Sequence, residues 1–510
     1  MENYLLSAIV LIPIIAAILI MLMPEKEVLG PRVMATSAAL LTVALSVVAY
    51  VLYDPSNARN YEVNIPWIEG LGMQYHVAAD GVSVAMLLLT SITIFTGCLI
   101  SWEIKERHKE FFALLLILVA GVFGVFIAFD LFLFLVFYEL AVLPMYLLIG
   151  IWGTGRREYS AMKLTLYLML GSALLILPIF GLYVQAHAAT GVWSMDYDFL
   201  SSNFRLDEHW QSIFFPMVFI GFGTIGGLWP VHTWSPDGHA SAPSAVSMLH
   251  AGVLMKLGGY GIIRIGLQFM PDGAQDWAFF FACLTVVNIV YGSLSAMRQT
   301  DMKYIIAYSS VSHLGLVTLG ICTLSVAGIN GAVYQMFAHG IMTALLFALV
   351  GVVYGRLHTR DIREMGGLAK IIPFTATAFV FAGMTGLGLP GLSGFVSEVL
   401  VLTGAFSAGV IGMPSPLLKY VALICLTGVV FTAIYVLRAM QKMFFGEPTE
   451  ALITSKYYIT LRDTDIREKL ALGVLMAVIV LAGAYPAWLV NLINSGLAHG
   501  VFPVLGLSGF

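Results

Sequence analysis

The amino-acid sequence predicts an all-α protein that crosses a membrane many times. Of its 510 residues, 59% are hydrophobic and only 11% are charged, whereas a soluble domain has about 45–50% apolar and about 25% charged residues. Apolar runs of roughly 20 residues, the length of a helix that spans a bilayer, recur along the whole chain. Together with two breaks rich in glycine and proline, these observations predict a polytopic helical bundle.

The apolar runs define about 14 candidate transmembrane helices. They lie at residues 4–23, 32–53, 80–101, 111–129, 131–152, 160–186, 212–231, 243–270, 277–297, 303–324, 327–355, 371–408, 417–445 and 470–493. No Lys or Arg precedes the first run, so we interpret it as a retained helix and not as a signal peptide. Asp130 lies where two runs meet, and we expect it to cap a helix or to lie at the membrane interface.

The distribution of Lys and Arg predicts how the chain is oriented. If the N-terminus lies outside and the spans alternate, 20 of the 25 Lys and Arg residues fall on the inner side, as the positive-inside rule requires. Both termini then face the outer side. We expect the long outer loops 54–79 and 187–211 to form ordered caps. The inner segment 446–469 is expected to include an amphipathic piece at the membrane surface.

Two helix breaks predict an internal repeat. One apolar run ends at WPVHTWSPDG, which begins at Trp229, and GLGLPGLSGF interrupts another at residues 386–395. Broken helices at corresponding positions of two halves indicate a transport site, because the freed backbone groups line a hydrated cavity. The breaks fall in helices 7 and 12, the fourth members of two five-helix sets (helices 4–8 and 9–13), and an odd number of helices inverts the second set.

The repeats divide the chain into four predicted parts. They are residues 1–110 with helices 1–3, residues 111–270 with the first repeat, residues 271–446 with the second repeat, and residues 447–510 with the inner amphipathic segment, helix 14 and the tail.

Five ionisable residues inside the predicted spans indicate the chemistry of the protein. A charged side chain at the bilayer centre costs at least about 2.5–3.5 kcal/mol, so such a residue is a candidate functional site. Lys256 is the clearest case, because it lies halfway along the eighth predicted helix. The others are Glu139, His313, His339 and Glu398. Burial favours the neutral forms of carboxylates and amines, and a hydrated row of such groups can pass protons through a membrane.

Simpler explanations exist for several of these polar residues. The ammonium of Lys256 can snorkel to a membrane interface, and a lone histidine beside Ser or Thr is often a hydrogen-bonded core residue. A structural glutamate in mid-membrane is harder to explain, because it needs its own cationic partner. His232, Asp237 and His239 suggest a metal site, but their spacing is no recognised zinc pattern. A proline-rich turn with a helix-capping Asp explains them better.

The sequence does not indicate nucleic-acid binding or redox chemistry. The net charge is −4, and no basic patch with interleaved aromatic residues occurs. The four Cys residues lie in apolar runs at unrelated spacings, which predict neither disulfides nor a metal site. The sequence has no glycine-rich nucleotide loop, CxxC set or haem or flavin signature. Any redox chemistry linked to this chain is therefore expected in other chains.

Five motifs give the chain a specific resemblance. They are YELAVLPMYLLIGIWG (138–153), HTWSPDGHASAPSAVSMLHAGVLMKLGGYGIIR (232–264), RQTDMKYIIAYSSVSHLG (298–315), YQMFAHGIMTALLF (334–347) and LPGLSGFVSEVLVL (389–402). In content, order and spacing the chain resembles the subunit M family of proton-pumping NADH–quinone oxidoreductase, respiratory complex I. These antiporter-like membrane subunits contain two inverted five-helix repeats. The PMY that follows the glutamate resembles subunit M more than subunit L or the Mrp antiporter proteins.

The resemblance implies roles for individual residues. The family's helix-five glutamate falls on Glu139 and its helix-eight lysine on Lys256. The helix-ten and helix-eleven histidines fall on His313 and His339, and the ionisable residue of helix twelve falls on Glu398. The implied function is proton translocation through these groups, driven by electron transfer from NADH to quinone in other subunits.

The resemblance also implies cofactors, partners and location. We expect this chain to bind no cofactor itself, with NADH, FMN, iron–sulfur clusters and quinone held by partner subunits. The expected partners are the antiporter-like L and N subunits, the small K-type and J-type subunits and the lipid bilayer. The expected location is a bacterial-type inner membrane, with both termini on the periplasmic side.

One position departs from the family pattern. The family has a lysine in helix seven, seven residues before the His of the HTW motif, as the partner of the helix-five glutamate. That position is Ile225 here, and the span contains no cation. A bare carboxylate in mid-membrane is expected to be protonated. As a hypothesis, a protonated His250 replaces the missing lysine as the partner of Glu139.

Three other functions remain open from the residues alone. One is a subunit of a Mrp-type Na+/H+ antiporter, which a sodium-dependent gradient without redox partners would indicate. Another is the equivalent subunit of a hydrogenase- or ferredoxin-linked complex, in which only the electron donor differs. The last is a membrane spacer without a part in proton transfer.

Overall fold

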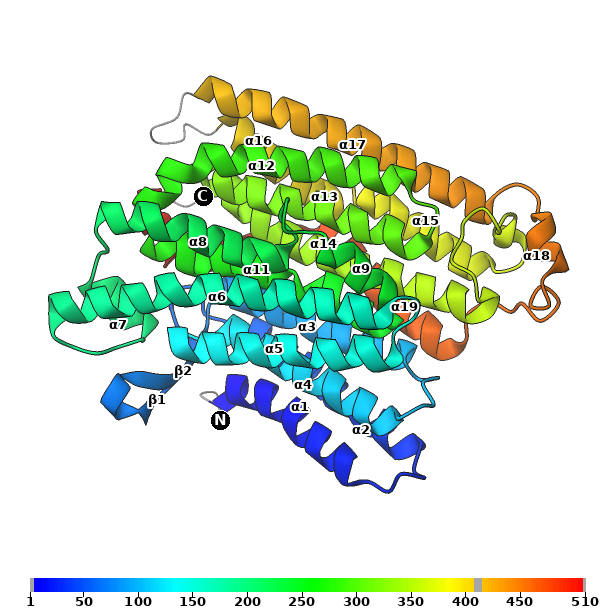
Figure 1. Ribbon diagram of the computed structural model, residues 1–510, viewed down its shortest axis with the longest axis horizontal. Helices are drawn as coiled ribbons and strands as arrows, with labels where there is room; N and C mark the ends of the chain where they lie inside the picture. Colours follow the sequence, from blue (N-terminus) through cyan, green and yellow to red (C-terminus); the bar gives the residue numbers. More distant parts are fainter. Residues whose placement is uncertain (1–3, 408–414, 508–510) are drawn as a thin grey trace.

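The computed structural model describes residues 4–407 and 415–507 and consists of long, roughly parallel α-helices (Figure 1). Among the described residues, eleven helices are long and apolar enough to cross a membrane, or up to twelve if one bent pair counts as a span. Ten of them are α1 (Leu5–Leu22), α2 (Leu29–Val51), α3 (Gly81–Ile100), α4 (His108–Ile127), α5 (Leu131–Trp152), α6 (Arg157–Thr190), α12 (Pro271–Arg298), α13 (Met302–Cys322), α14 (Val326–Leu357) and α17 (Ser415–Phe444). The eleventh, residues 244–267, has several parts.

Three predicted helices fall outside this group: helices 7 and 12, which were predicted to be broken, and the last one, helix 14. Helix 7 corresponds to α8 (Glu208–Gly226), and helix 12 to α15 (Pro373–Gly386) followed by α16 (Ser393–Ser407). The last predicted helix is the bent pair α19 (Ile466–Ala484) and α20 (Ala487–Ala498), whose axes differ by 76°. Each predicted span therefore has a helix or a helix pair at its place, while the count of 14 and the inverted repeat stay predictions.

Glycines with left-handed backbone angles make both predicted breaks. Gly227, with φ +76°, ends α8, and the chain then turns before the short helix α9 (Trp234–Ser241). Gly388 and Gly391, with φ +67° and +92°, separate α15 from α16. Other residues avoid this region because their Cβ atom crowds the backbone, so these glycines permit sharp turns inside the bundle.

The eighth predicted helix is completely buried and irregular. It consists of α10 (Ser244–Leu249), the π-helical stretch η3 (His250–Leu254), α11 (Lys256–Gly261) and a second π-helical stretch η4 (Ile262–Leu267). It packs against α3, α8 and α14. A Cβ atom at Gly258 would lie 2.6 Å from the carbonyl oxygen of Phe222 on α8, so glycine permits this close approach. This helix is the centre of the bundle.

A small cap covers one end of the bundle. It comprises the antiparallel strands β1 (Asn60–Ile68) and β2 (Met73–Ala79), joined through η2 (Glu69–Leu71), and the short helix α7 (Tyr197–Asn203). We call these elements the hairpin cap. Asp130 accepts hydrogen bonds from Phe132 N and Leu133 N at the start of α5, which confirms its predicted capping role. The ordered cap was expected, but its strands depart from the all-α prediction.

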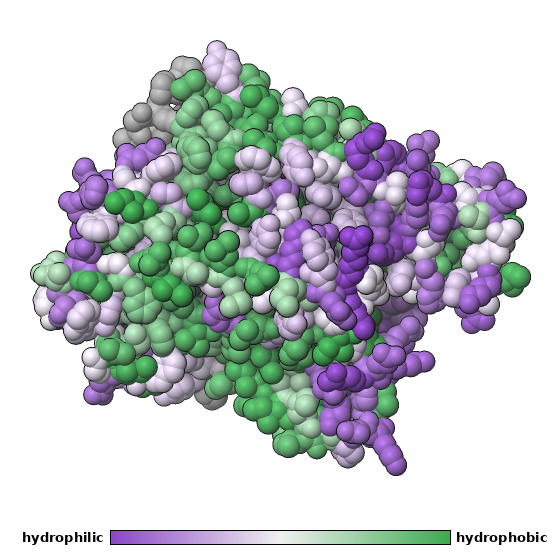
Figure 2. All heavy atoms as spheres, viewed as in Figure 1, coloured by the Kyte–Doolittle hydropathy of each residue, from purple (hydrophilic) through white to green (hydrophobic). Residues whose placement is uncertain are grey.

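The surface agrees with a membrane-embedded bundle. Figure 2 shows mostly apolar residues along the helices and hydrophilic residues gathered at the ends, most densely at the end where α18 (Glu450–Thr454) lies. The helices with apolar outer surfaces can therefore face lipid or other apolar chains. Segment 446–469 forms this five-residue helix and turns, and α21 (Val501–Val504) follows α20 near the C-terminus.

A buried ion pair ties the central helix to α3. Arg264 of η4 pairs with Asp80, the N-cap residue of α3, and the two side chains are only 6% and 2% exposed. The guanidinium also donates to the Tyr260 hydroxyl at 3.1 Å and to Ser83 Oγ at 3.3 Å. These extra hydrogen bonds satisfy donors that would otherwise be buried without partners.

Removing one partner of this pair should destabilise the fold, because it leaves an uncompensated buried charge. We expect Asp80→Ala to lower the free energy of unfolding by about 3–5 kcal/mol. The matched control is Arg205→Gln, which breaks the Arg205–Asp272 pair whose guanidinium is 73% exposed and should cost less than about 1 kcal/mol. Thermal unfolding of the purified chain measures both, and equal losses would contradict a structural role for the buried pair.

Candidate functional site

Lys256 lies at the centre of the candidate site. Its side chain is 0% exposed. Its Nζ donates to the backbone carbonyl of Ala251 and forms a hydrogen bond with His339 Nδ1 at 2.8 Å. In the π-helical stretch, Met255 N–H donates to the carbonyl of His250 five residues back, at 3.1 Å. In an α-helix it would donate to Ala251. The wider turn therefore leaves the Ala251 carbonyl able to receive the ammonium.

A row of polar side chains extends from Lys256 across the second half of the chain. The ring of His339 on α14 lies 5.2 Å from the ring of His313 on α13, measured between centroids. Gln335 Nε2 donates to His313 Nδ1 at 3.4 Å, and Gln335 Oε1 accepts a hydrogen bond from the Ser397 hydroxyl. The structure thus brings together Lys256, His339 and His313 from three different helices. Two polar residues that were not predicted, Gln335 and Ser397, extend the row from His313 to α16.

The two histidines of this row each keep one buried nitrogen without a hydrogen-bond partner. These atoms are Nε2 of His313 and Nε2 of His339. Buried polar groups are rarely left unsatisfied, and ordered water is a usual partner. The unsatisfied nitrogens mark places where water can connect the two rings.

Glu398 lies at the end of the row, beside the second helix break. It follows Ser397 on α16 and is half-buried. Its carboxylate lies against Gly388, where an added Cβ atom would come 2.5 Å from Oε2. The break therefore makes room for the predicted glutamate. No hydrogen bond or ion pair of this carboxylate occurs within residues 4–407 and 415–507.

Glu139 stands apart from the row. It is half-buried on α5. In the described parts of the chain its carboxylate has no hydrogen bond or ion pair with Lys256, His250 or any other side chain. Ile225, at the position where the resemblance led us to expect a lysine, is fully buried. The structure thus brings Lys256, His313 and His339 together with Glu398 nearby, and it leaves Glu139 without a direct link to them.

His250 lies among aromatic rings. Its ring stacks on Trp234 at 5.1 Å and lies 4.3 Å from the ring of His239, and neither of its nitrogens has a hydrogen-bond partner. Both neighbours belong to α9, so His250 packs against the first helix break. A pairing of His250 with Glu139 stays a prediction.

Asp237 does not act as the helix cap that its sequence suggested. Thr233 is the N-cap residue of α9, without a capping side chain, and Asp237 lies in the first turn. Its carboxylate accepts hydrogen bonds from Lys163 on α6 at 2.8 Å and from the Tyr304 hydroxyl on α13 at 3.0 Å. The reason is positional, because inside the bundle the carboxylate meets two side-chain donors from neighbouring helices.

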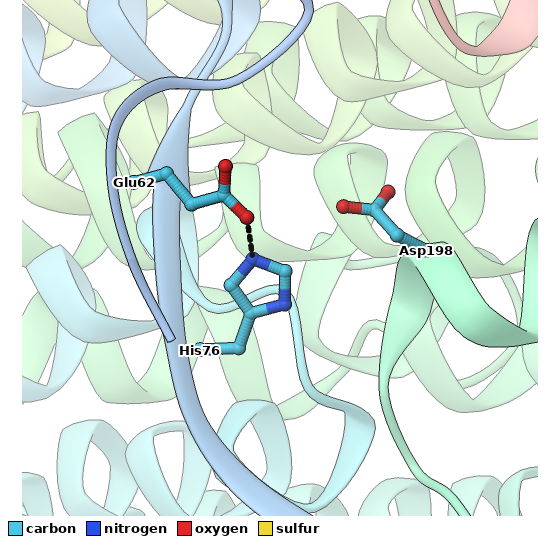
Figure 3. A group of neighbouring side chains, drawn as sticks. All are labelled: Glu62, His76 and Asp198. Carbon is cyan, nitrogen blue, oxygen red and sulfur yellow. Dashed lines mark hydrogen bonds and ion pairs between the residues drawn. The ribbon is translucent and has the colours of Figure 1, made fainter. Parts of the chain in front are cut away.

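A group of side chains that could hold a metal ion occurs elsewhere in the described chain. Glu62, His76 and Asp198 of the hairpin cap offer ligand atoms that all lie within 4.8 Å of one another (Figure 3). The predicted site residues of the bundle core form no such group in the described parts. The Cys residues are all free thiols, as their spacing predicted.

Gln335 and Ser397 were missed by the sequence analysis, although the sequence carries a signal for each. Gln335 lies four residues before His339, so both side chains occupy one face of α14. Ser397 directly precedes Glu398. The spacing shows which residues share a helix face, but only the packing of α13, α14 and α16 shows that they meet.

Comparisons with known proteins agree with this arrangement. A family model for the transmembrane region of NADH:quinone oxidoreductases and Mrp antiporters matches residues 128–427. NADH-quinone oxidoreductase subunit M from Rhodobacter capsulatus is 37% identical over 512 residues, which cover 98% of this chain and 96% of the relative. Subunit M from Rickettsia bellii is 34% identical, over 97% of this chain and 98% of the relative.

Solved structures have the same fold. A chain of respiratory complex I from Thermus thermophilus superimposes with a TM-score of 0.86 and 26% identity, and the match covers 98% of this chain and all of that chain. By its family model, its full-length relatives and its structure, the chain belongs to the subunit M family of NADH–quinone oxidoreductase, the antiporter-like membrane subunits of respiratory complex I.

Proposed function

We propose that this chain carries protons across a membrane as the antiporter-like M subunit of a NADH–quinone oxidoreductase. The observation that carries the proposal is the buried polar row from Lys256 through His339, His313, Gln335 and Ser397 to the neighbourhood of Glu398. Burying so many polar groups in an apolar bundle is costly. Proton transfer explains why they occur together.

Lys256 and His339 form the first step of the route. A charged Lys256 holds a proton on Nζ, 2.8 Å from the acceptor Nδ1 of His339. A unit charge brought to about 5 Å changes the energy of the ammonium by about 3.3 kcal/mol at an effective dielectric constant of about 20. A charge change nearby is therefore enough to shift Lys256 between its charged and neutral forms.

Gln335 is a positioning residue in this scheme. Its amide donates to Nδ1 of His313, so the neutral ring carries its hydrogen on Nε2. Lys256 likewise donates to Nδ1 of His339. Both rings then carry their hydrogen on Nε2. Once a ring gains a proton on Nδ1, it can release the one on its unsatisfied Nε2 to water. Glu398 receives the proton at the far end, next to the helix break.

The redox chemistry belongs to other chains in this proposal. NADH, FMN, iron–sulfur clusters and quinone are held by partner subunits, and this chain acts as a non-redox translocase. Its neighbours are antiporter-like L and N subunits and small K-type and J-type subunits. The chain lies in a bacterial-type inner membrane with both termini on the periplasmic side. The distribution of Lys and Arg and the apolar band of Figure 2 support this placement.

Loss of the central lysine should stop proton translocation through this subunit. We expect Lys256→Ala to lower the rate of proton uptake into vesicles containing the assembled complex by at least about tenfold, because the first donor is removed. Lys419→Ala, which changes an exposed lysine, is the control and should leave the rate unchanged. Intact coupled translocation in the Lys256→Ala complex would favour the membrane-spacer function, and a sodium requirement would favour the Mrp-type antiporter.

The positioning role of Gln335 can be tested on its own helix. Gln335→Leu should slow proton translocation by about tenfold, since His313 loses the donor that fixes its tautomer. Asn330→Leu is the matched control, because Asn330 is also a buried amide on α14 but donates to Asn494 and the Val326 carbonyl, away from the row. The initial rate of vesicle acidification measures both. Equal losses of rate in the two variants would show that the Gln335 amide contributes only to packing.

The contact between the second break and Glu398 gives a further prediction. Gly388→Ala should reduce proton translocation several-fold, because the new Cβ atom would displace the Glu398 carboxylate. Gly391→Ala is the control. It has the same positive-φ strain, of about 1–3 kcal/mol, but a Cβ atom there meets nothing within 4 Å. The measurement compares the translocation rates of the Gly388→Ala and Gly391→Ala variants, each in the same amount of assembled complex. Equal rates would contradict the proposed role of the contact.

A further inference from the structure

The hairpin cap gathers three potential metal ligands from three separate elements. Glu62 lies on β1, His76 on β2 and Asp198 on α7. Figure 3 shows Glu62 and His76 joined by a hydrogen bond, with the carboxylate of Asp198 facing them from the opposite element. One ligand atom from each residue lies within 4.8 Å of the others.

The histidine of this group is held as a metal-bound histidine usually is. Its side chain is 1% exposed, and its Nδ1 bonds to the carboxylate of Asp196. Asp196 also caps α7 by accepting from Phe199 N at 2.8 Å, which fixes its position. A carboxylate on one ring nitrogen orients the ring and leaves the other nitrogen as the ligand. Here that atom is Nε2, which lies 3.1 Å from Glu62 Oε1.

The charges of the group also suit a divalent cation. Glu62, Asp196 and Asp198 carry three negative charges, and Arg59 supplies one positive charge through its pair with Asp198. Two negative charges remain when His76 is neutral, and a divalent ion would balance them. Arg59 also contacts the ring of Phe129 at 4.2 Å and donates to the Ala58 carbonyl at 3.0 Å, so it has other anchors. A carboxylate has about four lone-pair sites, which lets Asp198 serve Arg59 and a metal together.

We propose that Glu62, His76 and Asp198 bind a divalent transition-metal ion of the zinc class, through one imidazole nitrogen and two carboxylate oxygens. Zinc takes nitrogen ligands at about 2.0–2.1 Å and oxygen ligands at about 2.0–2.2 Å. The three atoms therefore have to draw together slightly. Glu62 can do so, because its side chain is 46% exposed and only one of its carboxylate oxygens contacts His76. Water completes the coordination.

A proton competes with the metal for Nε2. Burial lowers the pKa of His76, but the hydrogen bond and charge of Asp196, with the charges of Asp198 and Glu62, outweigh burial and raise the pKa above its ordinary value. Metal binding releases this proton. The bound ion would join the hairpin to α7 by a bond to each of three elements, in addition to the His76–Asp196 and Arg59–Asp198 contacts that already connect them.

The test is a titration of the purified full-length chain in lipid nanodiscs with Zn²⁺ alone. Cys283→Ser serves as the background, because Cys283 is an exposed free thiol that could bind zinc itself. Saturable binding is expected, with one imidazole and only nitrogen and oxygen ligands in the zinc X-ray absorption spectrum. Glu62→Gln, Asp198→Asn and His76→Gln should each weaken the affinity by at least about tenfold.

Two further variants test whether zinc binding depends on this particular group of residues. Glu69→Gln removes an exposed carboxylate from the same hairpin, outside the group, and should leave the affinity unchanged. Arg59→Gln should tighten binding, because it frees Asp198 from a competing cation. Absence of saturable binding overturns the proposal, as does an affinity that neither Glu62→Gln nor Asp198→Asn changes. Glu62 is exposed, so its variant keeps the test decisive even if His76→Gln fails to fold. The result is independent of proton translocation.

Discussion

The structure depends on the need of one buried ammonium for hydrogen-bond acceptors. Lys256 is fully buried in an apolar bundle, where an isolated charge is costly. The central helix meets this need by widening into a π-helical stretch, which makes the Ala251 carbonyl available. The second acceptor is His339, which links the ammonium to α14. The same two features that satisfy Lys256 thus place it at the start of a polar row.

The two helix breaks place side chains where a continuous helix would leave no space for them. At the second break, Gly388 leaves the space that the Glu398 carboxylate fills. At the first break, His239 and His250 lie ring against ring without hydrogen-bond partners for most of their nitrogens. The first half therefore differs from the second, because Glu139 has no cationic partner in the described chain and Ile225 is an apolar residue where the resemblance led us to expect a lysine. The proposal for proton transfer accordingly rests on Lys256 and the second half.

The hairpin cap and the buried ion pair hold the end of the central helix that follows Lys256. Asp80 caps α3 and pairs with Arg264, while Asp130 caps α5 and accepts from Gln74 N of the hairpin. Arg59, which directly precedes β1, and Arg264 of η4 both lie over the ring of Phe129. The end of the central helix is therefore fixed by charge as well as by packing, and the candidate metal group lies directly beside it.

The sequence by itself determined the membrane class, the positions of the helices, both breaks and the ionisable residues Lys256, His313, His339 and Glu398. These follow from local properties, because hydropathy, glycine geometry and the cost of buried charge act along the chain. Tertiary structure alone decided which of these residues meet. It added Gln335, Ser397 and the Asp80–Arg264 pair, gave Asp237 side-chain partners instead of a capping role, and left Glu139 outside the row. Contacts between helices distant in sequence depend on how their faces pack, which no local pattern records.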